Sequence, residues 1–289
     1  MSRPAGGPAA TPRWVADPAV LSALRDVSHP PEGLWVLGDV AALQGAPHRH
    51  VAIVGTREAT PYGLRIAADL AAACARAGLV VVSGMARGID AAAHRAAVDA
   101  GGQTIAVQGT GVDVPYPVSH RALHAVLAQR ATIISEVEPG TTAFRGCFPR
   151  RNRLIAALSK VVVVVEADHK SGAINTATHA LTLNGTVAAV PGRVDVAQSA
   201  GTNQLLFDGA QMVREPADLL SLCGVSQNSY HLSGHPDTRA VEYTEPEERA
   251  GEAFSDFARR VLDAELIRSR GPLPGRQDGV GEPSSGTGE

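Results

Sequence analysis

Short apolar runs alternate with longer amphipathic stretches from residue 50 onward, and this alternation constrains the fold more than any other feature. The plainest run is VVVVV at residues 161–165, where positions facing both sides of a strand are apolar. Strands buried on both faces are typical of parallel sheets that helices cover on each side. Helical connections between successive strands favour the same arrangement. The sequence therefore predicts an α/β domain with a doubly wound, mostly parallel sheet.

The individual elements can be assigned along the chain from their periodicity. Strands are predicted over residues 51–54, 79–82, 104–107, 132–134, 161–165, 187–190 and 211–213. Helical patterns lie between them, over residues 64–77, 91–100, 120–129, 152–158 and 174–184. Gly78, Gly101 and Gly185 follow three of these helices, where glycine commonly ends a helix.

Composition divides the rest of the chain. Residues 1–13 are rich in Pro, Gly and Ala and are predicted to be disordered, as are residues 276–289. The folded core is expected over 14–225, of which 14–49 form a preface with a helix near 19–27 and an edge strand at 34–37. Residues 226–250 have the pattern of a linker. Residues 251–275 contain an amphipathic helical pattern and are interpreted as a small C-terminal segment.

The distribution of charge does not argue against a nucleic-acid partner, and the cysteines and the hydropathy restrict the class of protein. The formal net charge is −3, yet residues 51–215 carry 15 basic against 12 acidic side chains, and the acidic excess lies after residue 215. The three cysteines are widely spaced without CxxC, which predicts reduced thiols rather than a disulfide framework or a zinc site. Without an apolar run of roughly 18–20 residues or a signal-peptide pattern, the chain is predicted to be cytoplasmic and not bound to membrane.

Glycine-rich loops follow several predicted strands. Gly55, Thr56 and Arg57 follow the first strand, and SGMARGID at 83–90 follows the second. The carboxyl ends of parallel strands share one sheet edge, where ligands bind. Backbone N–H groups and the positive end of a helix dipole meet there, so an anion can bind, with Ser83 and the loop amides beside Arg57. The alternative is a plain turn in which Arg57 pairs with a carboxylate.

The segment FPRRNR at 148–153 is the densest basic element of the chain. Arginines beside an aromatic ring in a loop at the sheet edge suit single-stranded nucleic acid, where Arg neutralises phosphate and the ring stacks on a base. The alternative is a helix start with Phe148 in the core. At least one of these arginines is also expected to pair with Glu136, Glu138 or Glu166.

Sequence patterns for catalysis and cofactors are absent. The first strand is followed by GTREATPYG, so it lacks GxGxxG, and the chain has no GxxxxGK[ST] phosphate loop. His94, His120, His124, His169 and His179 share no metal-ligand spacing and are interpreted as structural or surface residues. We therefore predict no cofactor, no metal and no catalytic residue. Glu166, at the end of a buried strand, is interpreted as an orienting partner for Arg or Ser, with a general base as the alternative.

At this point the ordered motifs can be matched to a family. GTREATPYG, SGMARGIDAAAH, GTGVDVPYP, ISEVEPG, FPRRNRLIAALS, VPG and GTNQLL closely resemble the DprA (Smf) family of DNA-processing proteins over roughly residues 14–223. The resemblance implies an extended Rossmann-like fold that binds single-stranded DNA and self-associates as a homodimer. It also implies a recombination mediator that helps load a RecA-type recombinase during natural transformation, without catalysis or a cofactor.

The resemblance also implies site residues, carried over by motif. The matching positions in the family's DNA pocket are Thr56, Arg57, Ser83, Gly84, Arg87, Gly88, Phe148, Arg151, Asn152 and Arg153. Gly55 and Arg150 complete the candidate DNA- and phosphate-binding set, and Asp90, Glu166, Ser171 and Gly172 are supporting candidates. The chain departs from the family at His120, where Asn is usual, and in the segment 251–275, which at most corresponds to a degenerate winged helix.

Two other functions stay open at this level. Related Rossmann-like folds include nucleotide-binding or nucleotide-hydrolysing enzymes and sensors with a PGGxGTxxE pattern. The nearest segments here, PGRVD at 191–195 and AGTNQLL at 200–206, lack the glutamate that this pattern places by its glycine loop. A diverged family member could also serve as a scaffold in a phage or defence context.

Overall fold

Across residues 11–225, nine strands form one central sheet. The computed structural model describes residues 11–225, and the expectations for 1–10 and 226–289 lie outside the described residues. The strands are β1 (Arg13–Val15), β2 (Leu34–Gly38), β3 (His50–Val54), β4 (Val80–Ser83), β5 (Thr104–Val107), β6 (Thr132–Ser135), β7 (Val161–Val164), β8 (Thr186–Ala189) and β9 (Gln211–Met212). Their order is β1-β2-β6-β5-β4-β3-β7-β8-β9.

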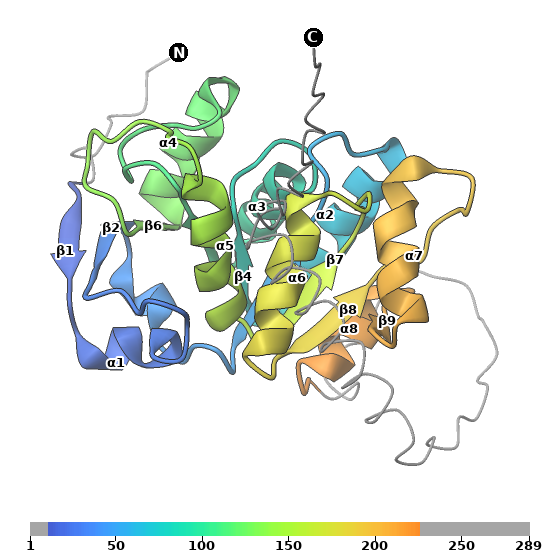
Figure 1. Ribbon diagram of the computed structural model, residues 1–289. Coiled ribbons are helices and arrows are strands. Elements are labelled where there is room, and N and C mark those ends of the chain that lie inside the picture. Colours follow the sequence, from blue (N-terminus) through green and yellow to red (C-terminus); the bar gives the residue numbers. More distant parts are fainter. Residues whose placement is uncertain (1–10, 226–289) are drawn as a thin grey trace, which may run out of the picture.

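The α-helices cover both faces of this sheet. They are α1 (Pro18–Leu21), α2 (Pro61–Arg76), α3 (Ile89–Asp99), α4 (Arg121–Arg130), α5 (Cys147–Ala157), α6 (Gly172–Thr182), α7 (Ala200–Phe207) and α8 (Pro216–Leu222). In Figure 1, α5, α6 and α7 lie in front of the strands, and α2 and α3 lie behind them. The strands from β3 to β9 run parallel. The predicted α/β, Rossmann-like, doubly wound sheet is therefore confirmed.

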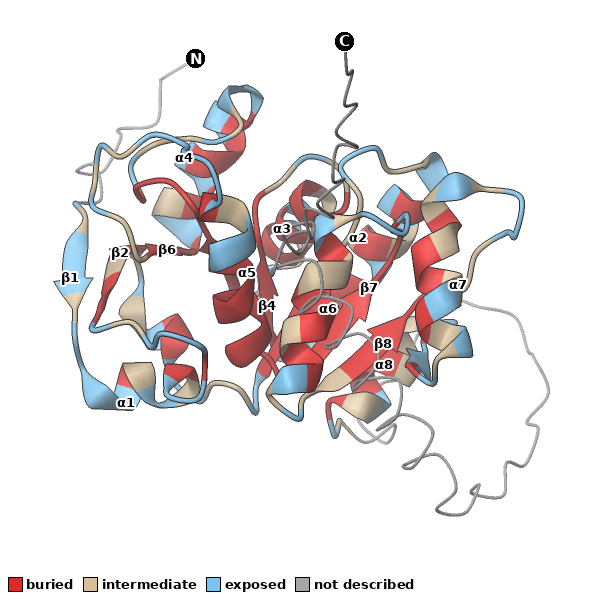
Figure 2. Cartoon of the chain, in the orientation of Figure 1, coloured by how far each residue is buried: buried red, intermediate tan, exposed pale blue. Residues whose placement is uncertain are grey.

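Alternate residues of each central strand contribute to two separate cores. In β3, Ala52 and Val54 pack with α5 and α6, whereas Val51 and Ile53 pack with α2 and α3. This follows from the alternation of side chains along a strand. All five residues of β3 are buried, and Figure 2 shows the interior strands as buried throughout. The two-sided apolar pattern seen in the sequence is the direct consequence.

The direction of the chain across the sheet reverses next to β3. Strands β4, β5 and β6 extend to one side of β3, and the crossover through α5 then returns the chain so that β7 pairs on its other side. The carboxyl ends of β3 and β7 therefore diverge into helices on opposite faces. Such a topological switch point leaves a crevice at the sheet edge, which is the usual ligand site of open α/β sheets.

The N-terminal preface differs from the prediction in one respect. The expected edge strand at 34–37 is β2, but it lies between β1 and β6 and pairs antiparallel with both, so the edge position was wrong. Strand β1 forms the edge instead, and the rings of Trp14 and Trp35 approach with centroids 5.4 Å apart across the β1–β2 pair. A three-residue edge strand is too short for periodicity to reveal it.

Helix α5 begins earlier than predicted. The periodic pattern placed its start at residue 152, but the helix begins at Cys147, directly after Gly146 with φ +86°. Pro149 is compatible with the first turn, because the N–H it lacks would have no partner within the helix there. FPRRNR is therefore helical and not a strand-edge loop. The helices α7 and α8, which are short, were not predicted.

Candidate nucleic-acid interface

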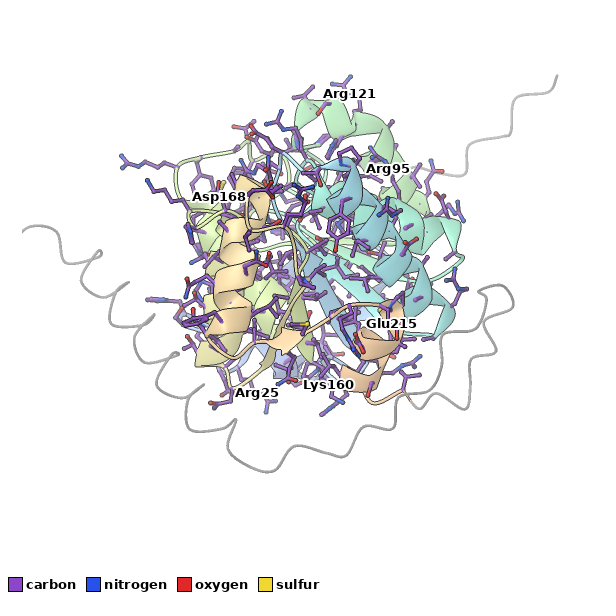
Figure 3. The ribbon with its side chains drawn as sticks, turned by 90° about the vertical axis from the view of Figure 1, so that its right-hand side faces the viewer. Arg25, Arg95, Arg121, Lys160, Asp168 and Glu215 are labelled. Atoms are coloured by element: carbon purple, nitrogen blue, oxygen red, sulfur yellow. The ribbon has the colours of Figure 1, made fainter. Side chains whose placement is uncertain are left out.

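A cleft of about 450 Å³ opens at the topological switch point. Its walls come from the loops after β3, β4 and β7 and from the first turns of α5 and α6. Asp168, one of the lining residues, lies toward one end of the molecule in Figure 3, whereas Lys160, in the turn before β7, lies at the opposite end. The cleft is thus at the carboxyl edge of the parallel strands, where the sequence predicted the ligand site.

Three helices begin at this cleft. Residues from the first turns of α5 and α6 line it, and so does Asp90 in the first turn of α3. The first N–H groups of a helix have no partner within the helix and carry the positive end of its dipole. The N-terminus of α6 has a partial internal cap, because the hydroxyl of Ser171 accepts from the N–H of Ala173 at 3.3 Å. The combined field favours an anion in the cleft.

Arg57 and two aromatic rings form a stack at the rim. The guanidinium carbon of Arg57 lies 5.5 Å from the ring centroid of Phe148, within cation–π distance. The ring of Tyr116 lies 4.8 Å from that of Phe148. Phe148 therefore contacts both Arg57 and Tyr116, and Tyr116 is itself 37% exposed. Phe148, which was expected to stack on a base, is half-buried and lines the cleft beside Arg57.

A second, smaller cleft of about 260 Å³ lies beside the first. Arg57, Arg87, Phe148 and Arg151 line both clefts, and Tyr116 lines only the smaller one. The Arg57–Phe148 pair therefore stands between two hollows. A chain of repeating units that passes this pair would place successive units on either side of it.

The exposed cations of the cleft are Arg57, Arg87 and Lys170. Lys170, like Tyr116, was missed by the sequence reasoning. A signal existed for each: Lys170 is one of two lysines in the chain and directly precedes Ser171, and Tyr116 belongs to the motif GTGVDVPYP. The carboxylates of Glu58 and Asp168 also line the cleft, so its charge is mixed rather than uniformly positive.

The first two loops are in direct contact. Gly88 has φ +75°, and a Cβ there would lie 2.3 Å from the carbonyl oxygen of Thr56. The N–H of Ile89 donates to that same oxygen at 3.3 Å. A Cβ on Gly55 would likewise lie 2.5 Å from the side chain of Ile89. Both glycines are thus required for the loops to meet, which agrees with the prediction that Arg57 lies beside the SGMARGID loop.

The second loop does not present its polar groups as expected. The hydroxyl of Ser83, predicted to hold a phosphate, is fully buried and donates to the carbonyl of Ile53 at 2.7 Å. The carboxylate of Asp90 accepts from the N–H groups of Gly84 at 3.1 Å and Ala86 at 3.2 Å. Two of the loop N–H groups that were predicted to bind an anion are therefore already hydrogen-bonded to Asp90. Burial raises the pKa of Asp90, an effect that the charge of Arg151 opposes.

Arg151 lies inside the molecule and is only 6% exposed. Its Nη1 donates to the carbonyl of Gly84 at 2.7 Å and also to the carbonyl of Val107. Burial lowers its pKa to about 10. Arg151 thus binds the carboxyl ends of β4 and β5 to helix α5.

The remaining residues of FPRRNR have separate partners. Arg153 is buried and lies away from the cleft, donating to Glu136 at 2.6 Å and to the carbonyl of His29 at 2.9 Å. Arg150, with its side chain 59% exposed, lies 3.7 Å from Glu136. Glu136 was one of three acidic partners expected for these arginines. Asn152 lines the cleft and donates to Gly172 and Asn175.

Glu166 has a different partner from the one expected. Its carboxylate accepts from the N–H of Thr60 at 2.9 Å and from the hydroxyl of Thr60 at 2.5 Å. A Cβ on Gly63 would lie 2.2 Å from the same carboxylate. Glu166 therefore stabilises the start of α2, rather than orienting an arginine or serine of the cleft.

The histidines and cysteines of residues 11–225 do not contribute to the lining of the cleft. Among residues 11–225, none of either type lines it, and no group of three or more His, Cys, Asp or Glu is arranged to hold a metal ion. His94 is buried, and burial lowers its pKa to about 3. Cys74, Cys147 and Cys223 are buried and free.

Comparison with known proteins identifies the family of the chain. The family model described as DNA recombination-mediator protein A matches residues 13–224. The chain therefore belongs to this family, whose curated members carry the names DprA and Smf. The resemblance found in the ordered motifs is confirmed.

Two curated relatives illustrate the extent of the match. A DNA processing protein DprA of Mycobacterium tuberculosis is 42% identical over 250 residues, which cover 86% of this chain and 64% of the relative. A protein Smf of Synechocystis is 40% identical over 210 residues, covering 72% of this chain and 52% of the relative. The chain thus spans about half to two thirds of the length of these relatives.

Two solved structures share the fold. DNA processing protein A from Streptococcus pneumoniae matches with a TM-score of 0.68 and 34% identity, covering 73% of this chain and 74% of that one. DNA processing protein A from Helicobacter pylori matches with a TM-score of 0.66 and 33% identity, covering 76% and 97%. The work on the latter describes a unique single-stranded DNA binding mode. Across residues 11–225, no helix of this chain is long and apolar enough to span a membrane.

Proposed function

We propose that the two clefts bind single-stranded DNA. The observation that carries this proposal is the stack of Arg57, Phe148 and Tyr116, which stands between two hollows at the convergence of three helix N-termini. A permanent positive charge held beside aromatic rings suits a ligand with repeated phosphates and bases. The family and the description of the Helicobacter pylori relative support the same ligand class.

Each exposed group has a role in this proposal. Arg57, Arg87 and Lys170 neutralise phosphates, and the guanidinium of Arg57, held against the ring of Phe148, donates two N–H groups to one phosphate. Tyr116 supplies an exposed ring on which a base stacks, since every base offers a π-face. Thr56 and the first turn of α6 add neutral polar donors. The cleft needs no sequence-specific contact to bind DNA in this way.

The proposal extends to the cellular role through the family. The protein would act in the cytoplasm as a homodimer that mediates recombination, delivering single-stranded DNA to a RecA-type recombinase during natural transformation. Membership of a recombination-mediator family supports this role. A pull-down of a RecA-type recombinase by the protein, with and without oligo-dT, tests it. If the protein retains no recombinase either with or without oligo-dT, the loading role is refuted. The proposal that the protein binds DNA is tested separately.

The DNA site is tested by titrating oligo-dT at two salt concentrations. Wild type should bind, and its affinity should fall steeply with salt because bound phosphates release counterions. Arg57→Ala and Lys170→Ala should each weaken binding, by about tenfold for Arg57, which corresponds to roughly 1.4 kcal/mol for a charge-assisted contact.

A matched control is Arg65→Ala. Arg65 is also exposed and also lies against an aromatic ring, 5.8 Å from the centroid of Tyr62, but it does not line either cleft. This variant should bind oligo-dT like wild type. No binding by wild type, or equal binding by Arg57→Ala, would rule out the assignment.

A nucleotide-hydrolysing enzyme is the rival function, and the geometry gives it little support. Asp90, the buried carboxylate that lines the cleft, already accepts two backbone hydrogen bonds, and Glu166 lines neither cleft and is bound to Thr60. No histidine among residues 11–225 lines the cleft to act as a general base. We therefore propose that the protein is not an enzyme. Incubation with nucleoside monophosphates should release no free base, and release by wild type would refute this.

A further inference from the structure

The guanidinium of Arg151 is anchored at the floor of the cleft by backbone carbonyls. Nη1 donates to Gly84, at the end of β4, and to Val107, at the end of β5. These two strands are neighbours in the sheet, and Arg151 belongs to α5, which covers one face. One side chain thus joins two strand ends to the first turns of a helix.

The space around this guanidinium is fitted closely. A Cβ on Gly84 would lie 2.4 Å from Nη1 of Arg151 and 2.6 Å from its central carbon. The N–H of Gly84 is bound by Asp90, and its carbonyl by Arg151. Gly84 is therefore held on both sides, and its lack of a side chain is what admits the arginine.

Arg151 is linked to the exposed cation through its own helix. Phe148 lies three residues earlier in α5, a spacing that places two side chains on the same helix face. Phe148 in turn lies against Arg57, 5.5 Å from its guanidinium carbon. Any shift of the first turns of α5 therefore moves the ring that fixes Arg57.

We infer that Arg151 is a positioning residue, which sets the place of α5 and thereby orients Phe148 and Arg57, rather than a residue that neutralises a DNA phosphate. This inference rests on the proposed binding of single-stranded DNA by the same cleft. Arg151 of FPRRNR was expected to contact the DNA, and the inference instead gives it the role of holding helix α5 in place.

The salt dependence of binding separates the two roles. A residue that neutralises one phosphate of a single strand contributes about 0.7 to the slope of log affinity against log salt. A positioning residue makes no phosphate contact of its own, so its loss changes the slope only through the residue that it orients. In an Arg57→Ala background, loss of such a residue should therefore leave the slope unchanged.

Two variants of the full chain test the inference by oligo-dT titration across a salt series. Gly84→Ala removes no charged group but displaces Arg151 through its new Cβ. Arg151→Gln keeps an amide donor for the carbonyls but removes the charge. Both should bind about fivefold to tenfold more weakly than wild type, and in an Arg57→Ala background neither should lower the slope further. Arg57→Ala is the control that lowers the slope by about 0.7.

A double-mutant comparison adds a readout that a general loss of stability would not give. In an Arg57→Ala background, Gly84→Ala and Arg151→Gln should each cost little further affinity, because the group they orient is gone. Thermal unfolding curves check that each variant is folded under the conditions of the titration. If Gly84→Ala does not fold, the titrations of Arg151→Gln alone test the inference.

Three outcomes overturn the inference. The first is a slope that falls by about a further 0.7 when Arg151→Gln is added to Arg57→Ala, which would indicate direct phosphate contact by Arg151. The second is wild-type affinity in the Arg151→Gln single variant, and the third is a full additional loss of affinity in the Arg57→Ala background. If wild type itself does not bind oligo-dT, the proposed function fails first, and the positioning role fails with it.

Discussion

At the scale of single residues, the contact between Glu166 and the start of α2 shows how one buried carboxylate shapes the rim of the site. Glu166 is 2% exposed and binds both the N–H and the hydroxyl of Thr60. Thr60 in turn caps α2 by accepting from the N–H of Gly63 at 3.2 Å. A carboxylate at a helix N-terminus is also favoured by the helix dipole. The loop that carries Arg57 is thereby fixed at its far end.

Gly63→Ala should destabilise the protein, by about 1–3 kcal/mol, because the added Cβ would overlap the Glu166 carboxylate. Urea denaturation measures the free energy of unfolding. The sign is informative, since replacing glycine by alanine within a helix ordinarily stabilises it by about 1 kcal/mol. A more stable Gly63→Ala variant would mean that Glu166 does not approach α2 as closely as described.

At the scale of elements, helix α5 divides one basic motif between the cleft and the interior. Phe148, Arg151 and Asn152 line the cleft, whereas Arg153 reaches Glu136 and the N-terminal preface. Arg150 remains exposed on the outer surface of the helix. Helical geometry alone produces this division, because neighbouring residues point in directions about 100° apart. A basic cluster in sequence is therefore not a basic cluster in space.

Arg153→Met should lower the free energy of unfolding by about 3 kcal/mol, because it leaves the carboxylate of Glu136 in a largely buried position without its closest partner. Arg150 is exposed and also lies near Glu136. Arg150→Met should therefore change the free energy of unfolding by less than about 1 kcal/mol. Chemical denaturation of both variants gives the comparison. Equal losses in the two variants would contradict the different burial of these side chains.

At the scale of the whole molecule, the interior between the sheet and helix α3 contains a histidine whose protonation opposes folding. His94 is fully buried on α3, and its Nδ1 lies 2.7 Å from the hydroxyl oxygen of Thr104. That hydroxyl donates to Val81, so Nδ1 carries the proton and donates to Thr104. Burial, with the charge of Arg151, lowers the pKa of His94 to about 3. The folded protein therefore holds this ring neutral.

The free energy of unfolding should consequently fall as the pH falls from 6.5 toward 3. In this window the unfolded chain binds a proton at His94 that the folded protein does not bind. The free energy of unfolding therefore rises with pH and decreases in acid. The loss attributable to His94 is at most roughly 5 kcal/mol across the window.

His94→Asn, which keeps a donor toward Thr104, should give a flatter dependence of stability on pH. His169→Asn, a change at an exposed position, should retain the wild-type curve. Denaturant titrations at several pH values measure both. Identical curves for wild type and His94→Asn would show that another group causes the acid sensitivity.

The fold was predictable from sequence to a considerable degree, and for an identifiable reason. Apolar runs such as 161–165 are local, and a strand buried on both faces must be apolar at nearly every position. The predicted strands 51–54 and 104–107 accordingly coincide with β3 and β5 to within a residue. The edge strand β1 and the first turns of α5 were not predicted, because neither has enough periodic positions to be recognised.

The site was predictable in part. Glycine-rich loops and helix starts are local features, so Arg57, Arg87 and Phe148 could be assigned to one sheet edge from the order of the motifs. Whether a side chain is exposed depends on tertiary packing rather than on the local sequence. Ser83 and Arg153 belong to the same motifs, yet their side chains turn inward to Ile53 and Glu136.

What the sequence determined by itself is the doubly wound sheet, its glycine-rich edge and the family, since all three depend on residue order and local periodicity. Only the tertiary structure decided which cations face the cleft. The crossover through α5 brings β7 beside β3, and this packing buries Arg151 against Gly84 and Val107 while leaving Arg57 exposed over Phe148. A guanidinium inside the molecule satisfies carbonyls, whereas one at the rim is available to a phosphate, and that difference arises only when distant segments pack.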